Sequence, residues 1–409
     1  MSFLDKLASL IVLVSSLLIL ILPVAIIAFP KGGLLVVLML ILSLVGLGLY
    51  RDKVVLERWE RYFLLSFGTY FVIVALSVWW FDGDWHDLDT PSRLVLVLPI
   101  FLFTRKLSIG INWFIWSIVA ASTIIGVNQL MLEFGSYGLY DFQDNTGIVT
   151  LYASIFGLSN FLFIHQDRSK ILNLIFFSAA LLGMVASLLS GGRGVWIAAF
   201  LSIIVILILN PMGWHSRIKS IIFAAFLSIV LIAYLVPQTR VENRIDLAFS
   251  GVSSWVEDGK SNTSSGSRLE MWKAAYEIIK SNPVIGVGEG KYAQHKQVLI
   301  NQKKVNQYIG QFNHPHGEYI SSLVEQGVVG FIAFLLVLLT PIKRAFHASK
   351  KKIRHNDRVP IIFTMVLVLH YTFYSFTSGV FDHQSTTLFY AVFIAISLGL
   401  IKSSLKAKS

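Results

Sequence analysis

Cysteine is absent from this sequence and charged residues are scarce, and each shortage excludes a class of protein. With no cysteine in 409 residues, disulfide bonds, thiolate metal ligands and cysteine nucleophiles are excluded. Charged residues make up 14% of the chain and hydrophobic residues 55%, whereas soluble domains contain roughly 25% charged residues. The composition therefore argues against a soluble domain and predicts an all-α polytopic membrane protein.

Long hydrophobic runs recur along the chain at lengths that suit membrane-spanning helices. About twelve runs approach the length of about 20 apolar residues that crosses the hydrocarbon core. We read the first run as a retained span, because it is longer than the core of a signal peptide and no clear cleavage site follows it. The candidate spans are 7–29, 34–50, 62–81, 94–104, 111–132, 148–164, 171–189, 194–210, 220–236, 319–340, 359–377 and 386–401.

The short connections between the spans predict their orientation. The connection 341–358 and the tail after residue 401 are rich in Lys and Arg, and short loops of this kind stay on the cytoplasmic side. Counting back along the chain puts both termini in the cytoplasm and the segment 237–318 outside it. Much of the net charge of +11 thus serves orientation, and no nucleic-acid partner is expected.

One large polar loop divides the hydrophobic chain. The expected organisation is a first group of nine spans in residues 1–236, the loop in residues 237–318, and three spans with a cytoplasmic tail in residues 319–409. The loop is the longest polar stretch of the chain, so we look for chemistry there.

A short helix is expected within the loop. Ser267 followed three residues later by Glu270 has the spacing of a capping box, and apolar residues then recur at helical spacing until Ser281-Asn282-Pro283 ends the pattern. This places Arg268 in the first turn of the helix. The polar stretch 261–266 before it reads as flexible.

Two histidines stand in the turn before the candidate span at residue 319. Histidine is the side chain most easily poised to accept a proton near neutral pH, so His316 is the candidate base and His314 its support. The alternative is an interfacial histidine hydrogen-bonded to a nearby carbonyl. Two ring nitrogens without an obvious third ligand are a weak metal signal, and neither a metal nor a cofactor is expected.

Two arginines fall on the same predicted face of the membrane as these histidines. Arg193 follows Ser190-Gly191-Gly192, where small residues let a ligand approach closely. Its alternative role is that of an arginine whose long side chain simply reaches the membrane surface. Because the planar guanidinium suits phosphate oxygens, Arg193 and Arg268 together could hold a diphosphate at the bilayer surface.

Several acidic residues are further candidates. Asp382 falls on the same face and either orients the base or an arginine, or forms a solvated turn. Asp82 and Asp84 form a rival pair that could bind a divalent metal or remove a proton, although their spacing matches no known metal loop. Glu318 and Glu325 lie at or inside the span predicted from residue 319, where a buried carboxyl suggests a proton relay.

Short motifs between residues 190 and 330 contain most of these candidate residues. They are Ser-Gly-Gly-Arg-Gly (190–194), Ser-Arg-Leu-Glu-Met-Trp (267–272), Asn-Pro-Val-Ile-Gly-Val-Gly (282–288), His-Pro-His-Gly-Glu-Tyr (314–319) and Glu-Gln-Gly-Val-Val-Gly (325–330). Together they resemble the bacterial O-antigen ligase and O-antigen polymerase family. The likeness covers roughly residues 140–400, and many relatives carry Asn where this chain has Gly317.

The resemblance implies a specific fold and activity. The fold would be that of a lipid-carrier-dependent, GT-C-like glycosyltransferase in the bacterial inner membrane. The preferred activity is that of an O-antigen ligase in lipopolysaccharide biosynthesis. Such an enzyme transfers a glycan from undecaprenyl diphosphate to a sugar hydroxyl of the lipid A-core oligosaccharide on the periplasmic face, without a metal and with inversion.

The resemblance also implies roles for individual residues. Arg193 and Arg268 would bind the diphosphate, His316 would act as base on the acceptor hydroxyl with His314 in support, and Asp382 resembles an acidic residue of the last periplasmic loop. Glu318 belongs to the same histidine motif as a supporting residue.

Two alternatives remain open on the sequence alone. An O-antigen polymerase uses the same donor but a second lipid-linked glycan as acceptor. A transporter or flippase of lipid-linked glycans also suits about twelve spans, but it predicts charged residues within spans and two related halves. Mainly Glu325 and His370 fall inside predicted spans, and no internal repeat is evident.

Overall fold

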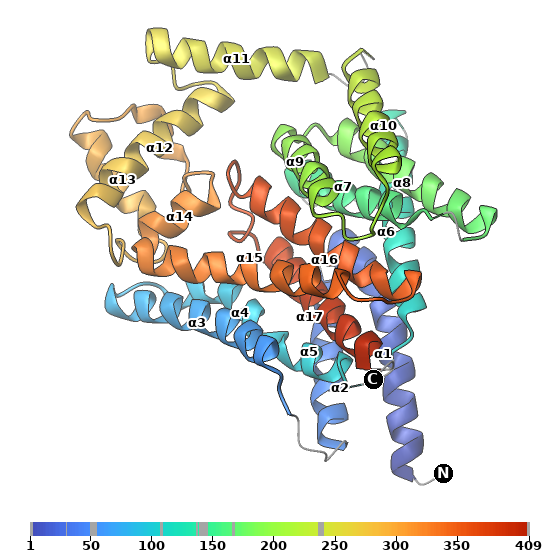
Figure 1. Cartoon of the computed structure of the whole chain (residues 1–409). Coiled ribbons are helices and arrows are strands. Elements are labelled where there is room, and N and C mark those ends of the chain that lie inside the picture. The colour runs from blue at the N-terminus through green and yellow to red at the C-terminus, as the bar shows by residue number, and fades with distance from the viewer. Residues whose placement is uncertain are drawn as a thin grey trace.

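A computed structural model of the chain describes residues 3–29, 31–49, 55–106, 109–135, 138, 146–165, 168–235 and 241–406. These residues form an all-helical protein without strands (Figure 1), as the sequence predicts. The helices of the first half are α1 (Phe3–Ala28), α2 (Gly33–Leu49), α3 (Arg58–Trp80), η1 (Trp85–Leu88), α4 (Asp89–Leu96), α5 (Leu98–Thr104), α6 (Ile111–Glu133), α7 (Thr146–Phe163), α8 (Lys170–Ser190), α9 (Arg193–Leu209) and α10 (Ser216–Leu235). The second half contains α11 (Val241–Asp258), α12 (Ser264–Ser281), α13 (Tyr292–Asn301), η3 (Gln307–Gln311), α14 (Glu318–Glu325), α15 (Gly327–Ser349), α16 (His355–Tyr374) and α17 (Gln384–Lys406).

Six of the described helices are long and apolar enough to cross a membrane, namely α1, α3, α6, α8, α15 and α17. Helices α2, α7 and α9 are apolar but shorter. Each candidate span of the sequence coincides with a helix or with two consecutive helices. The protein is therefore a multi-pass membrane protein, while the count of about twelve spans stays a prediction.

Two of the expected spans are divided in the structure. Helices α4 and α5 meet at Val97, two residues before Pro99, which has no backbone N–H to continue the helix. The helix expected from residue 319 consists of α14 and α15, which are separated at Gln326. The membrane candidate begins only at Gly327. Glu325 thus belongs to the short helix before the span.

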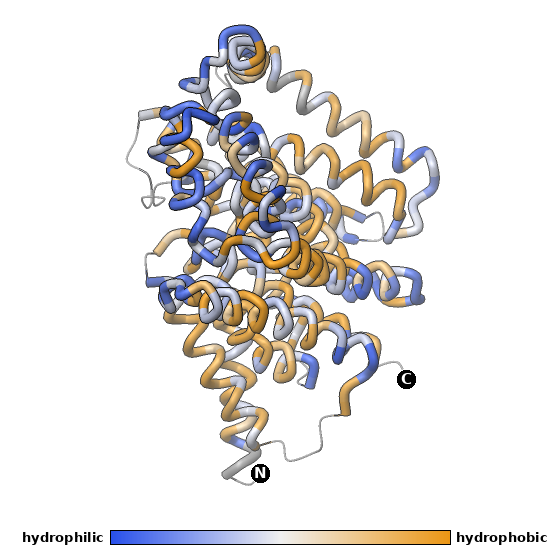
Figure 2. The backbone as a smooth tube through the Cα atoms, turned by 90° about the vertical axis from the view of Figure 1, so that its left-hand side faces the viewer, coloured by the Kyte–Doolittle hydropathy of each residue, from blue (hydrophilic) through white to orange (hydrophobic). Residues whose placement is uncertain are grey.

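The hydrophobic core is centred on α16 and α17. Figure 1 shows these two helices between the N-terminal helices in blue and the helices α7–α9 in green. Aromatic rings join them, with Tyr371 packing on Tyr390 at 4.8 Å and Phe363 on Phe393 at 5.8 Å between ring centroids. In Figure 2 the hydrophobic residues fill the long helices, whereas hydrophilic residues gather in the loop helices at the upper left and at helix ends.

The loop after α10 is folded around small cores of its own. One core contains Ala275, Tyr292 and Val324, and a second contains Met271 and Ile309. Helices α12, α13 and α14 supply most of these residues, and α11 packs beside α12. The sequence predicted α12 but missed α11, whose pattern of polar residues has no strong start signal.

The predicted start of α12 is wrong. Thr263 is the N-cap, since its side-chain oxygen accepts a hydrogen bond from the N–H of Gly266 at 3.0 Å. Glu270 does not cap the helix but accepts hydrogen bonds at 2.8 Å from the Trp255 indole and from the N–H of Asn306. The sequence offers several Ser, Thr and Asn caps in this stretch, and tertiary contacts choose between them. The end at Ser281 is as expected.

A glycine-rich turn joins the loop helices to the membrane helix α15. The N–H groups of Val287 and Gly288 donate to the carbonyls of Val324 and Glu325, both at 2.9 Å, at the end of α14. In return, the N–H of Val328 in the first turn of α15 donates to the carbonyl of Pro283 at 2.9 Å. The turn therefore satisfies the backbone groups that the break between α14 and α15 leaves free.

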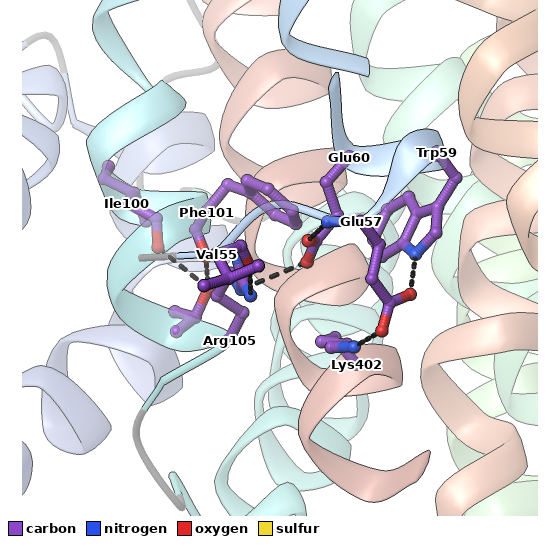
Figure 3. A network of polar contacts seen from close by, with 9 residues as sticks. Val55, Glu57, Trp59, Glu60, Ile100, Phe101, Arg105 and Lys402 are labelled. Atoms are coloured by element: carbon purple, nitrogen blue, oxygen red, sulfur yellow. Dashed lines mark hydrogen bonds and ion pairs between the residues drawn. The ribbon is translucent and has the colours of Figure 1, made fainter. Parts of the chain in front are cut away.

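Ion pairs join α5 and α17 to the N-terminal end of α3. Figure 3 shows Arg105 at the end of α5 paired with Glu60 of α3 at 3.0 Å, and Lys402 of α17 paired with Glu57. The Trp59 indole donates to the same Glu57 carboxylate at 2.7 Å. The connection before α3, the connection after α5 and the C-terminal end of α17 meet here, and the sequence predicts all three on the cytoplasmic side of the membrane.

Gly286 provides a test of the glycine-rich turn. Its backbone is left-handed with φ of 71°, and an added Cβ would lie 2.5 Å from the carbonyl of Glu325. We expect Gly286→Ala to lower the Tm of the purified protein by about 3 °C or more, because a left-handed residue with a Cβ loses roughly 1–2 kcal/mol. Gly68→Ala is the control, since Gly68 lies in α3 with open space around it. An unchanged Tm for Gly286→Ala would contradict the geometry of the turn.

Candidate functional site

The two histidines lie in a turn that several elements hold in place. His316 has a left-handed backbone with φ of 52°, which is rare for a residue with a Cβ. On one side, the Trp272 indole of α12 donates to the carbonyl of Pro315 at 2.9 Å. On the other side, the N–H of Glu318 donates to the carbonyl of Ser375 at 2.8 Å. The turn that carries His316 is therefore held between α12 and the end of α16.

The surroundings of His316 favour the neutral imidazole. Burial is the main cause that lowers its pKa, and the nearby Arg268 guanidinium lowers it further. The Asp382 carboxylate raises the pKa of His316, but the effects of burial and Arg268 are larger. A histidine with a lowered pKa is unprotonated at pH 7 and free to accept a proton.

The two arginines belong to different elements that lie near the end of α16. Arg268, in α12, is half-buried and within electrostatic range of both His316 and the Tyr374 phenol. Arg193 is the first residue of α9, and its neighbour Gly194 is so close to Thr377 and Tyr374 that a Cβ there would lie 2.3 Å from the Thr377 hydroxyl. Tyr374 thus lies beside both segments.

Asp382 contacts His314 and not His316. The distance from its Oδ2 to the His314 Nδ1 is 3.8 Å. The His314 side chain is 53% exposed and the Asp382 side chain 18% exposed. Both residues border a cavity of about 230 Å³ on this side of the turn, and neither of the arginines lines it.

This cavity is strongly acidic, and the sequence analysis missed most of it. It lies between α3, η1, α4, the turn at residues 289–290, α14 and the segment before α17. Its lining includes the carboxyl groups of Asp87, Glu289, Glu318, Glu325 and Asp382, the hydroxyls of Tyr70, Ser321 and Ser322, and the amide of Gln326. The signal that could have found it is the spacing of Glu318, Ser321, Ser322 and Glu325, which puts polar groups on one face of a helix.

Burial raises the pKa values of three carboxyl groups in the cavity. The pKa of Glu289 is raised to about 8, mainly by burial, although a hydrogen bond from Gln326 opposes the shift. Burial also raises the pKa values of Glu318 and Glu325 well above the usual range, and neighbouring carboxylates add to the effect. Glu318 accepts the N–H of Phe381 at 2.9 Å, which fixes the turn that carries Asp382.

The rival pair of carboxylates does not form a site. Asp84 accepts the N–H of His86 at 2.8 Å and caps η1, while Asp82 is exposed at a left-handed position. It is Asp87, further along the same loop, that reaches the cavity. Among the residues that the structure describes, no group of three or more His, Asp or Glu side chains is arranged to hold a metal ion.

A family model described as O-antigen ligase matches residues 177–335. The chain carries an O-antigen ligase domain. The matched region contains Arg193, Arg268, both histidines and α14, whereas Asp382 lies beyond it. The family comprises membrane glycosyltransferase-like enzymes, ligases and polymerases, and is consistent with a role in polysaccharide or lipopolysaccharide biosynthesis.

Two relatives extend this comparison. An uncharacterized protein of Haemophilus influenzae is 27% identical over 360 residues, which cover 86% of this chain and 90% of the relative. The exopolysaccharide production protein ExoQ of Rhizobium meliloti is 32% identical over 104 residues, which cover 25% of this chain and 23% of ExoQ. The first likeness spans most of both proteins, and the second only a part of each.

The raised pKa of Glu289 predicts a pH-dependent stability. A carboxyl whose pKa is about 8 in the folded protein, against 4.5 normally, stabilises the fold below pH 4.5 and loses that contribution as the pH rises towards 8. Glu289→Gln should therefore raise the Tm by about 2 °C or more at pH 8 and change it little at pH 5. The amide oxygen can still accept from Gln326.

Thermal unfolding of the purified protein between pH 5 and 8 measures this effect. Glu257→Gln is the matched control, because Glu257 is exposed on α11. Equal Tm changes at pH 5 and pH 8 for Glu289→Gln would show that Glu289 is not protonated in the folded protein.

Proposed function

We propose that this protein is an O-antigen ligase of the bacterial inner membrane. It transfers a glycan from undecaprenyl diphosphate to a sugar hydroxyl of the lipid A-core oligosaccharide at the periplasmic face. The observation that carries the proposal is the histidine turn, where a half-buried His316 is kept neutral by burial and by Arg268. A neutral base beside a cation suits the deprotonation of a hydroxyl next to a diphosphate.

The arginines would act on the leaving group. Undecaprenyl diphosphate departs as an anion, so positive side chains must offset the charge that develops on it. Arg268 of α12 lies within electrostatic range of Tyr374, and Gly194, which follows Arg193 in α9, packs against Tyr374. They would hold the diphosphate there without a metal ion or a nucleotide.

His316 would act on the acceptor. Its ring takes the proton from the acceptor hydroxyl while the oxygen attacks the anomeric carbon, and the bond from that carbon to the diphosphate oxygen breaks. Direct displacement inverts the anomeric centre. The proton then passes from His316 to solvent or to the departing diphosphate, which restores the base. His314, paired with Asp382, and Glu318, which fixes residue 381, support the geometry.

The lipid-carrier glycosyltransferase architecture, about twelve spans and cytoplasmic termini belong to the same proposal. A transporter is less well supported. Glu325 lies in α14 before the span, and both ring nitrogens of His370 are hydrogen-bonded at 2.9 Å, to Ser154 and to the carbonyl of Val366. No charged side chain is thereby left for a transport path at these two positions.

Polymerase activity is the second candidate, and the partial likeness to ExoQ, a protein of exopolysaccharide production, favours it. The donor would be the same, and the acceptor would be a second lipid-linked glycan. Reconstituted protein should be given both acceptors in parallel. A ligase forms the product joined to rough lipopolysaccharide, and a polymerase forms only longer lipid-linked chains.

The same assay tests the assigned residues. We expect His316→Ala to lower kcat by about 10²–10⁴-fold, the usual contribution of a general base. Arg268→Ala should lower kcat/KM for the donor by about 10–100-fold, since it removes charged hydrogen bonds. Lys280→Ala is the control, because Lys280 is exposed at the far end of the same helix. Transfer at the wild-type rate by folded Arg268→Ala protein would remove Arg268 from the site.

The pH profile separates a catalytic histidine from a structural one. Because the pKa of His316 is lowered, activity should persist below pH 6.5 and fall only on further acidification. In Arg268→Gln the neighbouring positive charge is lost, so the pKa of His316 rises and the acid limb of kcat/KM moves to higher pH. An acid limb at the same pH in both proteins would mean that another group controls the rate.

A further inference from the structure

The acidic cavity contains buried hydroxyl groups that have no partner. The side chains of Ser321 and Ser322 are 3% and 2% exposed. Neither hydroxyl oxygen has a hydrogen-bond partner among the described residues, and the same is true of the Gln326 side-chain oxygen. All three residues line the cavity. A buried polar group without a partner is unfavourable in a folded protein, so a ligand that supplies the missing partners would be bound.

The lining selects the chemistry of this ligand. Five carboxyl groups and no Lys or Arg side chain line the cavity, so it has no strong cation to pair with an anion such as a diphosphate or an acidic sugar. Sugar hydroxyls both donate and accept hydrogen bonds, and so match carboxyl, hydroxyl and amide groups together. The volume of about 230 Å³ is below the roughly 300–1,000 Å³ of pockets for drug-sized ligands. The cavity therefore suits a single sugar ring.

Part of the histidine turn lines the cavity, but neither arginine does. His314, Glu318 and Asp382 border the cavity, whereas Arg193 and Arg268 do not. Arg268 instead interacts with His316 and Tyr374. A diphosphate held by the arginines and an uncharged ring in the cavity would both adjoin the histidine turn.

We propose that this cavity binds the sugar residue that carries the acceptor hydroxyl, and that this residue is uncharged. The inference rests on the proposed glycosyl transfer and adds the acceptor subsite and its selectivity. Ser321, Ser322 and Glu325 bind the hydroxyls of the ring, and Glu289 and Gln326 close the inner end. Acidic and phosphorylated sugars are disfavoured, because no Lys or Arg side chain lines the cavity to pair with their charge.

Kinetics with the Ser321→Ala/Ser322→Ala double variant test the subsite. We expect its KM for rough lipopolysaccharide to rise about tenfold, through the loss of two hydrogen bonds, while its KM for the lipid-linked donor stays within about twofold. Ser281→Ala is the control, because Ser281 is exposed on α12. An unchanged acceptor KM overturns the proposal, and so does a rise in the donor KM alone.

A second measurement tests the selectivity. Acceptor oligosaccharides that end in a neutral hexose are compared with the same chains ending in the corresponding hexuronic acid. The wild-type protein should use the neutral acceptor with a kcat/KM at least about tenfold higher. Equal use of both acceptors would contradict the assignment of the acidic cavity to the acceptor ring.

Binding separates this inference from the proposed function. His316→Ala protein retains the cavity, so it should still bind a fluorescent core oligosaccharide that ends in hexose, and unlabelled hexuronic-acid chains should compete poorly. If the wild-type protein transfers no glycan, the proposed function fails. If it transfers glycan but neither acceptor KM nor binding depends on Ser321 and Ser322, only the subsite is wrong. Single serine variants replace the double variant if the latter does not fold.

Discussion

The backbone hydrogen bonds around the break between α14 and α15 are the constraint on which the site depends. Residues 283–288 occupy the gap between two helices that would otherwise be continuous, and they bond to the last carbonyls of α14 and the first N–H groups of α15. This connection sets the direction of α14, and with it the positions of Glu318 and Glu325. It also brings Glu289 to the end of α3, where its N–H donates to the Ser77 hydroxyl at 3.1 Å. The loop helices are thereby fixed to two membrane helices at once.

A second feature follows from that connection, namely the cluster of carboxyl groups beside the histidine turn. Carboxyl groups from four separate parts of the chain line the cavity that His314 borders, and Arg268 acts on His316. Bringing carboxyls together in a buried place costs free energy, and the raised pKa values of Glu289, Glu318 and Glu325 are its sign. Proteins keep such unfavourable clusters where a ligand uses them.

The sequence predicted the features that depend on local pattern. Hydropathy located each apolar helix, Pro283 predicted the end of α12, and the histidine motif identified the turn. Features that depend on tertiary contacts could not be predicted. Thr263 rather than Ser267 caps α12 because Glu270 is held by Trp255 and Asn306. Glu289 reads as an exposed residue in a glycine-rich turn, and only the packing of that turn on α3 and α14 makes it half-buried.

The strained backbone of His316 gives a physical reason for its position in the turn. A left-handed residue with a Cβ loses roughly 1–3 kcal/mol and persists only where its neighbours hold it, here through Trp272 on Pro315 and Ser375 on Glu318. Gly317 carries no such strain, because its φ of −172° is open to any residue. A Cβ there would lie 3.3 Å from the carbonyl of Phe376, so an Asn at this position requires only a small shift. Having Gly317 where many relatives have Asn therefore leaves the backbone path of the turn that carries His316 largely unaffected.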